Sequence, residues 1–451
     1  MQALAKALKR LSVGDAMVRR NPLFYGDARA TIQMLLNADL QTRKAWTQER
    51  LSKMLWVASR CGYGKSVGGT TQLDRWPLLQ KEQVRLRPES FQASSRWLTI
   101  KASTGGTSGV PLQIVRSLPS VTFEQACIDA MIERLGADAR NARIAVLRGD
   151  NVKDPSDRAP PFWTEVAGGQ RLLFSSNHLD TTTVRAYADA LERFRPDLLF
   201  AYPTSLESLC LNLRAANVSL HIPRVLTSSE VLAPSVWQGA RETLNCRLLD
   251  YYGQAERVAF AYAEESETYR FLPGYAQIEL HETERNDQVA TFEVVATSLW
   301  NFSMPLPRYR TGDLIRLPAR FGAKEIREIA LGVRAFPGVL GRDRDVLISP
   351  TGIKLTGIDH FQRDVANLVR IQVIQESLHN VRVLVLAERA FSAQDEQHLM
   401  HNVRSKLPDS MQVQIERTEK LERTAASKIP FVIHRKAVAE ALRASEVTRS
   451  V

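Results

Sequence analysis

The sequence predicts an α/β protein with a large N-terminal domain, whose mostly parallel sheets are flanked by helices, and a small α+β C-terminal domain. Short apolar runs such as RIAVLRGD and DLLFAYPTS end abruptly in polar residues, and helix-period stretches such as TVRAYADALERF lie between them, a rhythm typical of parallel sheets. A charged turn, GRDRD, precedes a change of composition. At 451 residues the chain exceeds one ordinary core, so we place the domains at 1–340 and 341–451.

Composition narrows the class of protein. Apolar residues make up 44% of the chain and charged residues 24%, as in globular proteins. No run of eighteen apolar residues occurs, which predicts that no transmembrane segment is present. The four cysteines are far apart and form no CxxC pair, so we expect a reduced, cytoplasmic location and no zinc site.

The net charge of +11 is concentrated near the N-terminus, where the first hundred residues hold 17 Lys and Arg against seven Asp and Glu. A basic surface there suits an acidic carrier protein, an anionic membrane surface or nucleic acid, although a solvated basic surface is the simpler interpretation. The opening MQALAKALKRL places Leu4, Leu8 and Leu11 on one helical face. We expect a docked surface helix, and weak peripheral membrane association or an organellar presequence is left open.

Residues 27–60 carry apolar positions at helical spacing and predict helical packing without a catalytic pattern. Beyond them, KASTGGTSGVPLQ packs three glycines and four hydroxyl residues into residues 101–113. Backbone N–H groups and hydroxyls in such a loop can bind phosphate oxygens. Because Val110 and Pro111 follow Gly109, the P-loop NTPase signature is absent. An ordinary flexible turn is the alternative interpretation.

Two acids follow apolar strands in the expected order of elements. In DYYGQAE, two tyrosines leave the strand CRLLD, Gly253 permits a sharp turn, and Glu256 can reach a phosphate-bound Mg²⁺. In LPRYRTGD, Asp313 follows a rigid turn and can accept hydrogen bonds from both ribose hydroxyls. The simpler interpretations of these two segments are a common Tyr-Gly turn and an acid on the protein surface. GRDRD suits either a hinge or a surface hairpin.

The predicted small domain has strands at VRVLVLA and MQVQIER and a helix at DEQHLMHNVRSKL. Near its end, RTAASKIP contains Lys428, which on local grounds alone is an ordinary solvated lysine.

Taken together and in this order, STGGTSGVPL, DYYGQAE, YRTGD, GRDRD and RTAASKI resemble the motifs of the adenylate-forming ligase superfamily. The resemblance is strongest to the branch containing phenylacetate-CoA ligase and the capsular-biosynthesis adenylating proteins, and it extends to WPLLQKEQVR, AYPTSLESL and LTSSEVL. Five short motifs in one order over most of the chain are far more specific than any one of them.

The resemblance implies an ATP site. Its phosphate loop is Ser103, Thr104, Gly105, Gly106, Thr107 and Gly109. Glu256 is implied to hold Mg²⁺ and Asp313 to bind the ribose. The other implied nucleotide residues are Ser229, Glu230, Tyr251, Tyr252, Gly253 and Arg342. Lys428 is implied to be the catalytic lysine of a mobile C-terminal lid that pivots at Arg344. We place the acyl pocket at Tyr202, Pro203, Ser228, Gln254 and Phe260, whose aromatic members favour an aryl or other compact acid, although core packing can explain each aromatic alone.

The implied chemistry follows from charge, because a carboxylate must attack an α-phosphorus already surrounded by anionic oxygens. Mg²⁺ and the Lys428 ammonium would supply the opposing positive field. An acyl adenylate and pyrophosphate result, and the acyl group then passes to the thiol of CoA or of a carrier-protein phosphopantetheine. Departures from the common motifs are the order Thr104-Gly105-Gly106, the lack of a basic residue after Pro111, Arg344 in place of an acid, and Ser427 in place of a glycine. None removes a charge that the chemistry needs.

Two other functions are weighed. An adenylating enzyme can pass AMP or the acyl group to an acceptor that is not a thiol. A non-catalytic basic protein can bind nucleic acid or a membrane surface, but the sequence lacks the interleaved aromatic and basic pattern of a single-strand platform. That function also leaves Glu256, Asp313 and Lys428 unexplained. We therefore expect a small carboxylic acid and CoA or an acidic carrier protein as partners, with no nucleic acid, and a homodimer is left open.

Overall fold

The structure is a computed structural model that describes residues 17–93, 98–103, 112–148, 152–153, 157, 159–176, 178–342, 347–350, 354–355, 358–362, 365–404, 406–423, 429–435 and 438–439. The chain forms two compact units, Met1–Val339 and Leu340–Val451. Each unit has its own hydrophobic core. Among the described residues, no helix combines the length and the apolar character needed to cross a lipid bilayer.

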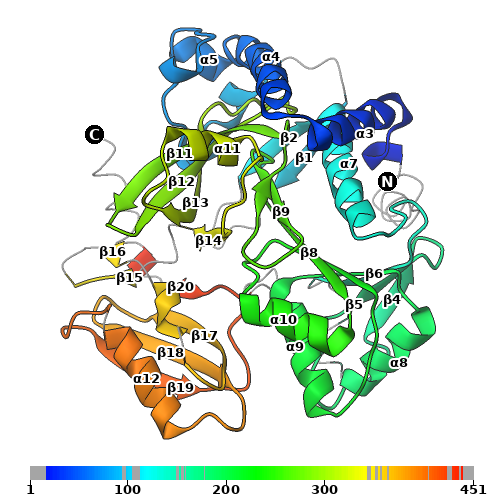
Figure 1. The fold of residues 1–451 in the computed structure, drawn as a ribbon, viewed down its shortest axis with the longest axis vertical. Coiled ribbons are helices and arrows are strands. Elements are labelled where there is room, and N and C mark those ends of the chain that lie inside the picture. The colour runs from blue at the N-terminus through cyan, green and yellow to red at the C-terminus, as the bar shows by residue number, and fades with distance from the viewer. Residues whose placement is uncertain are drawn as a thin grey trace. The chain divides into compact units, whose positions relative to one another are not determined.

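An eight-stranded sheet forms the centre of the larger unit, with the strand order β10-β9-β8-β7-β6-β3-β5-β4 (Figure 1). The five neighbours from β5 to β8 are parallel, and antiparallel pairs complete both ends. The predicted α/β class is therefore confirmed. The strands are β3 Ile144–Leu147, β4 Trp163–Val166, β5 Arg171–Phe174, β6 Leu198–Ala201, β7 Arg224–Ser228, β8 Arg247–Gly253, β9 Phe260–Ala263 and β10 Arg270–Phe271.

Three helices connect the parallel strands: α8 Val184–Phe194, α9 Pro203–Ala215 and α10 Pro234–Leu244. These helices join β5 to β6, β6 to β7 and β7 to β8, and each step moves in the same direction across the sheet. Because such crossovers are right-handed, all three helices lie on one face of the sheet. Figure 1 shows α9 and α10 side by side, and these two helices are in contact. In α8, Tyr187, Leu191 and Phe194 are buried at helical spacing, which explains why TVRAYADALERF folds as a helix against the sheet.

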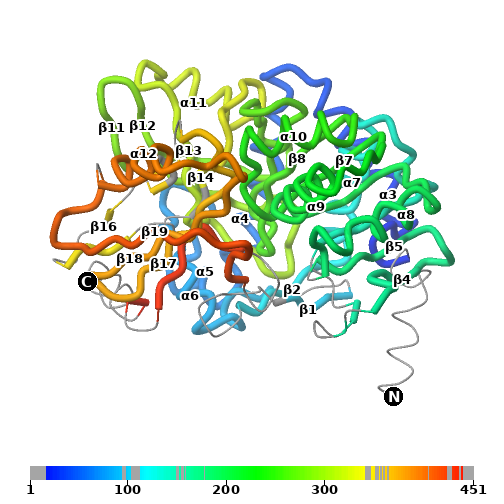
Figure 2. Tube along the Cα trace, turned by 90° about the horizontal axis from the view of Figure 1, so that it is seen from below, coloured from blue at the N-terminus to red at the C-terminus, as the bar shows by residue number. Residues whose placement is uncertain are grey.

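Further helices and two further sheets of the larger unit precede and follow this sheet along the chain. The helical interpretation of residues 27–60 is correct, since α3 and α4 cover nearly all of them. The strands β1 and β2 pair antiparallel on either side of residues 104–111, and a four-stranded sheet has the order β11-β12-β13-β14. Figure 2 traces these segments. Their bounds are α3 Pro22–Asn37, α4 Leu40–Ala58, α5 Gly62–Ser66, α6 Lys81–Leu86, α7 Leu118–Arg134, α11 Ala323–Ala330, the 3₁₀ turns Leu73–Arg75 and Pro88–Phe91, β1 Thr99–Ser103, β2 Gln113–Ser117, β11 Ala276–Arg285, β12 Val289–Ser298, β13 Tyr309–Pro318 and β14 Val339–Arg342.

The smaller unit is a sheet of order β19-β18-β17-β20 with one long helix. The strands predicted at VRVLVLA and MQVQIER and the helix within DEQHLMHNVRSKL are all present. Buried valines of β17 and β18 build its core together with Leu399 and Val403 of the helix. The elements are β15 Leu347–Ile348, β16 Lys354–Leu355, the 3₁₀ turn Ile358–Gln362, β17 Leu368–Gln375, β18 Asn380–Ala387, α12 Ala393–Arg404, β19 Gln412–Arg417 and β20 Val432–His434.

Candidate active site

The parallel strands β6, β7 and β8 end at a common edge of the sheet. Their register pairs Ala201 with Thr227 and Ser228 with Tyr251, so the residues that follow each strand lie close together. This edge is where ligands bind in open α/β sheets. Of the residues expected from the sequence, the structure brings Tyr202, Pro203, Ser228, Ser229, Glu230 and Tyr251 to it.

The strand β8 is longer than expected. The sequence placed the strand end at Asp250, but β8 continues to Gly253 because β9 pairs antiparallel with residues 250–253. Tyr251 and Tyr252 therefore point to opposite faces of the sheet instead of leaving it together. The expectation of a sharp turn at Gly253 is wrong, because the chain turns beyond β8, where Arg257 has a φ of 56°.

Tyr251 lies on an aromatic face of the sheet. Its ring stacks on Phe260 with centroids 5.0 Å apart and planes within 2°. Burial raises the pKa of the Tyr251 phenol, and the nearby Arg148 guanidinium opposes that rise. Phe260 is 1% exposed and belongs to the hydrophobic core, so its side chain supports Tyr251.

Tyr252 lies on the other face and donates a 2.6 Å hydrogen bond from its hydroxyl to Oδ2 of Asp313. Gln254 Nε2 lies 3.3 Å from the same oxygen. Burial, followed by the Asp313 carboxylate, raises the pKa of Tyr252 well above its usual value. The Tyr252 hydroxyl therefore stays protonated and can donate.

Asp313 sits inside β13, whereas the sequence suggested a position just after a turn. The β12–β13 register shifts at this point, so that residues 311–313 stand opposite Val294 alone. Gly312, with a φ of 72°, allows the bulge that this shift requires. The bulge brings the Asp313 carboxylate, which is 5% exposed, to Tyr252 of the central sheet.

Glu256 is a second buried acid, 5% exposed. Its Oε1 accepts a hydrogen bond from Lys81 Nζ at 3.0 Å and one from the Tyr309 hydroxyl at 2.9 Å. Burial acts to raise the pKa of the Glu256 carboxyl, but Lys81 and Tyr309 outweigh it and the pKa is lowered. Glu256 is therefore ionised at neutral pH. Lys81 begins α6 and was not singled out by sequence reasoning, although it lies in the motif WPLLQKEQVR.

The oxygen atoms of the site show whether it could hold Mg²⁺. Across the part of the chain that the structure describes, no three His, Cys, Asp or Glu side chains cluster as a metal site. Within the described residues, the side chains of Lys81 and Tyr309 both donate to Oε1 of Glu256, which leaves Oε2 as the oxygen that can accept a further ligand. Mg²⁺ is commonly held by one or two carboxylates together with substrate phosphates. A phosphate-bound Mg²⁺ fits these donors, whereas an all-protein metal cage does not.

Glu230 and Arg148 complete the edge. Glu230 Oε2 accepts the N–H of Thr204 at 3.0 Å, while its buried Oε1 has no hydrogen-bond partner among the residues that the structure describes. Arg148 Nη2 donates to the hydroxyls of Ser228 and Ser229, at 3.2 and 3.0 Å. Sequence reasoning missed Arg148, because one arginine after an apolar run carries no distinguishing signal.

Several expected site residues are not described, or are described only in part, by the structure. Ser103 and Arg342 end β1 and β14, but the structure describes only their backbone. The loop residues Thr104, Gly105, Gly106, Thr107 and Gly109, the pivot Arg344 and Lys428 lie outside the described residues. Their roles stay predictions.

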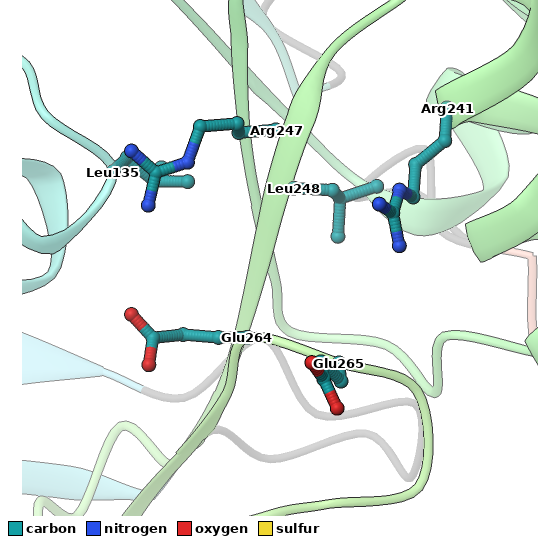
Figure 3. Close-up of a pocket in the computed structure, with 6 residues that line it drawn as sticks. All are labelled: Leu135, Arg241, Arg247, Leu248, Glu264 and Glu265. Atoms are coloured by element: carbon teal, nitrogen blue, oxygen red, sulfur yellow. The ribbon is translucent and has the colours of Figure 1, made fainter.

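A separate cavity of about 120 Å³ lies at the opposite edge of the same sheet, where β8 begins and β9 ends. Figure 3 shows Arg241 and Arg247 facing Glu264 and Glu265 across it. Ligand pockets usually measure roughly 300–1,000 Å³. This cavity is too small for a nucleotide, and Glu264 is already paired with Arg134 at 2.6 Å.

Comparison with solved structures identifies the class of fold. A 2-hydroxyisobutyryl-CoA ligase, crystallised in the postadenylation state with R3-HIB-AMP, aligns with a TM-score of 0.60 and 14% identity over 90% of this chain and 92% of that chain. Its complex with 2-HIB-AMP gives the same values. The chain thus has the fold of the adenylate-forming ligases, as the sequence motifs predicted.

A protein related in sequence indicates the branch within this class. Protein CapK of Staphylococcus aureus is 20% identical over 375 residues, which span 80% of each chain. Residues 347–435 match the family of the CapK C-terminal domain. The predicted resemblance to the capsular branch is therefore confirmed.

We predict that Lys81→Met lowers the free energy of unfolding by about 1–3 kcal/mol at pH 7, because it leaves the buried Glu256 without its cation. The pKa of Glu256 is lowered in the folded state, so the pair stabilises the fold above the ordinary value of 4.5 and loses its effect as pH falls through the folded value. Urea unfolding at several pH values should show the difference between wild type and variant shrinking below pH 5.

Lys53→Met is the matched control, since Lys53 pairs with Glu49 on an exposed helix face. Its loss should be at most about 0.5 kcal/mol. Equal losses in the two variants would mean that the Lys81–Glu256 pair is not a buried structural contact.

Proposed function

We propose that this protein uses ATP to convert a carboxylic acid into an acyl adenylate, with release of pyrophosphate, and then transfers the acyl group to a thiol. One observation carries the proposal. In a fold of the adenylate-forming class, two ionisable acids, Glu256 and Asp313, are buried and positioned by specific partners. Buried acids of this kind cost stability and are favoured where they bind a ligand.

We assign the ribose to Asp313. Its two carboxylate oxygens stand on a short, buried stem, and Tyr252 and Gln254 fix its orientation. A diol presents two adjacent donors, which a carboxylate can accept together. Adenine is assigned to Glu230, Ser229 and Tyr251, because the buried Glu230 Oε1 lacks a donor and an exocyclic amine supplies one.

The phosphates are assigned to the glycine-rich segment between β1 and β2 and to the region of Glu256. Mg²⁺, when bound, supplies positive charge that reduces the repulsion between the phosphates and the attacking carboxylate. Glu256 is ionised without a metal because Lys81 and Tyr309 stabilise its charge. Lys428 is assigned to bridge the reacting carboxylate and the α-phosphate. The reaction requires no general base, since the carboxylic acid substrate is already ionised at neutral pH.

The acceptor is assigned as the thiol of CoA or of a phosphopantetheine on an acyl carrier protein. Support for CoA comes from the 2-hydroxyisobutyryl-CoA ligase with which the chain shares its fold. Support for an acidic carrier protein comes from the excess of Lys and Arg in the first hundred residues. Transfer to an acceptor that is not a thiol is the competing outcome.

The activity can be tested without knowing the acceptor. With ATP, Mg²⁺ and hydroxylamine, a series of aryl and short alkyl acids should include members that give hydroxamate and pyrophosphate, and each should support exchange of labelled pyrophosphate into ATP. Addition of CoA should then yield a thioester with the same acids. If no acid supports exchange and ATP does not raise the melting temperature, the protein is not an adenylating enzyme.

We predict that Lys428→Ala lowers the rate of pyrophosphate exchange at least about a hundredfold, because the ammonium acts on charge that develops in the transition state. Thioester formation from a chemically prepared acyl adenylate and CoA should change little. The exposed neighbour Lys420→Ala is the control and should leave both rates unchanged. Equal loss of both half reactions in Lys428→Ala would contradict the assigned role.

We predict that Glu256→Gln raises the Mg²⁺ concentration for half-maximal exchange about tenfold, because the amide is a weaker ligand for a hard cation. Lys81→Met provides the comparison, since it keeps the carboxylate and removes a cation that competes with the metal. That variant should not raise the Mg²⁺ requirement when assayed at about pH 8, where a carboxyl is ionised. A similar increase in both variants would show that Glu256 acts through its ion pair alone.

A further inference from the structure

Arg148 holds a planar cation at the carboxyl end of β3. The centre of its guanidinium lies 4.1 Å from the ring centroid of Phe200 and 4.9 Å from that of Tyr202. Nη2 is anchored by the hydroxyls of Ser228 and Ser229. Rings and hydroxyls thus fix the plane of the guanidinium before any ligand arrives, which lowers the entropy lost on binding.

Among the residues that the structure describes, no acid balances the charge of Arg148. Within the described part of the chain, its recorded polar partners are serine hydroxyls, and no carboxylate forms an ion pair with it. Its Nε is buried without a hydrogen-bond partner. A partly buried cation with an unused hydrogen-bond donor lowers the stability of the fold unless an anion binds to it.

The register places Arg148 on one particular face of the sheet. Val146 pairs with Phe200 and Ser228 with Tyr251, and alternate residues of a strand share a face. Arg148 continues the alternation from Val146, and its contacts with Phe200 and Ser228 agree with this placement.

The residues assigned to ribose lie on the opposite face. Tyr252, which holds Asp313, points away from the side occupied by Tyr251. Arg148 therefore shares its side with Tyr202 and Ser228, which were expected to line the acyl pocket. The same side also holds Tyr251 and Ser229, which are assigned to adenine. Because adenine carries no charge, an anionic ligand group that meets Arg148 belongs to the acid and lies away from the ribose.

We propose that Arg148 is a specificity-determining residue that binds a second, unreacted carboxylate of the substrate, so that the enzyme activates one end of a dicarboxylic acid. The inference rests on the proposed function, since it describes the acid of that reaction. A guanidinium fork matches a carboxylate in shape and charge, and the rings of Phe200 and Tyr202 flank the carbon skeleton between the two acid groups.

The test compares matched acids in pyrophosphate exchange: benzoate with terephthalate, and straight-chain monocarboxylates with dicarboxylates of equal length from three to eight carbons. In the wild type, kcat/KM for the better dicarboxylates should exceed that of their monocarboxylate partners by at least about tenfold, since a buried charged group left unpaired strongly disfavours the analogue. Arg148→Met should reduce this ratio to about twofold or less, chiefly through a higher KM for the dicarboxylate.

Two further variants separate specificity from folding. Arg148→Lys keeps the charge and should retain part of the preference, whereas Arg143→Met should retain all of it. Arg143 precedes the same strand at its other end and packs on Phe194 with 4.6 Å between guanidinium and ring centroid, so it is a matched control for loss of an arginine on an aromatic ring. Melting temperatures of all variants check folding, and the preference of Arg148→Lys decides the case if Arg148→Met is unstable.

The outcomes are distinct. A wild type that activates only monocarboxylates, or prefers them, overturns the inference and leaves the proposed function intact. An equal loss of kcat/KM for both kinds of acid in Arg148→Met also overturns it, because Arg148 would then act on a group common to all substrates. If neither series supports exchange, the proposed function fails and this inference fails with it.

Discussion

Two buried carboxylates are central to the proposed site, and specific side chains hold each of them in place. Lys81 and Tyr309 stabilise the charge of Glu256 against the cost of burial, so the pKa of that carboxyl falls. Asp313 receives hydrogen bonds from Tyr252 and Gln254. Without such partners a buried acid would take up a proton and lose its value as a ligand.

These contacts depend on how the sheets are built. Parallel strands bring residues distant in sequence to one edge, and the extension of β8 by its antiparallel neighbour β9 separates Tyr251 from Tyr252. Tyr251 then lies on the aromatic face that also carries Phe200 and Arg148, whereas Tyr252 donates a hydrogen bond to Asp313 of the four-stranded sheet. The bulge at Gly312 completes the arrangement, since it aims Asp313 at the central sheet. The arrangement of the candidate site thus follows from register as much as from residue type.

The order of strands and helices could be predicted from the sequence because apolar runs and helical periodicity are local signals. Glu256 and Asp313 could be singled out because each lies in a short motif, and the structure shows that both are buried. Lys81 and Arg148 could not be assigned in this way, since their meaning comes from contacts with residues 175 and 80 positions away in the chain. The end of β8 was misjudged because a polar sequence after an apolar run continues as strand when a neighbour supplies hydrogen bonds.

We expect ATP to bind where β7, β8 and the bulge of β13 meet. A crystal structure of the protein with ATP and Mg²⁺ would locate the nucleotide. We expect the ribose hydroxyls within hydrogen-bond distance of Asp313 and the adenine amine beside Glu230. A nucleotide bound elsewhere, with both carboxylates untouched, would contradict this expectation.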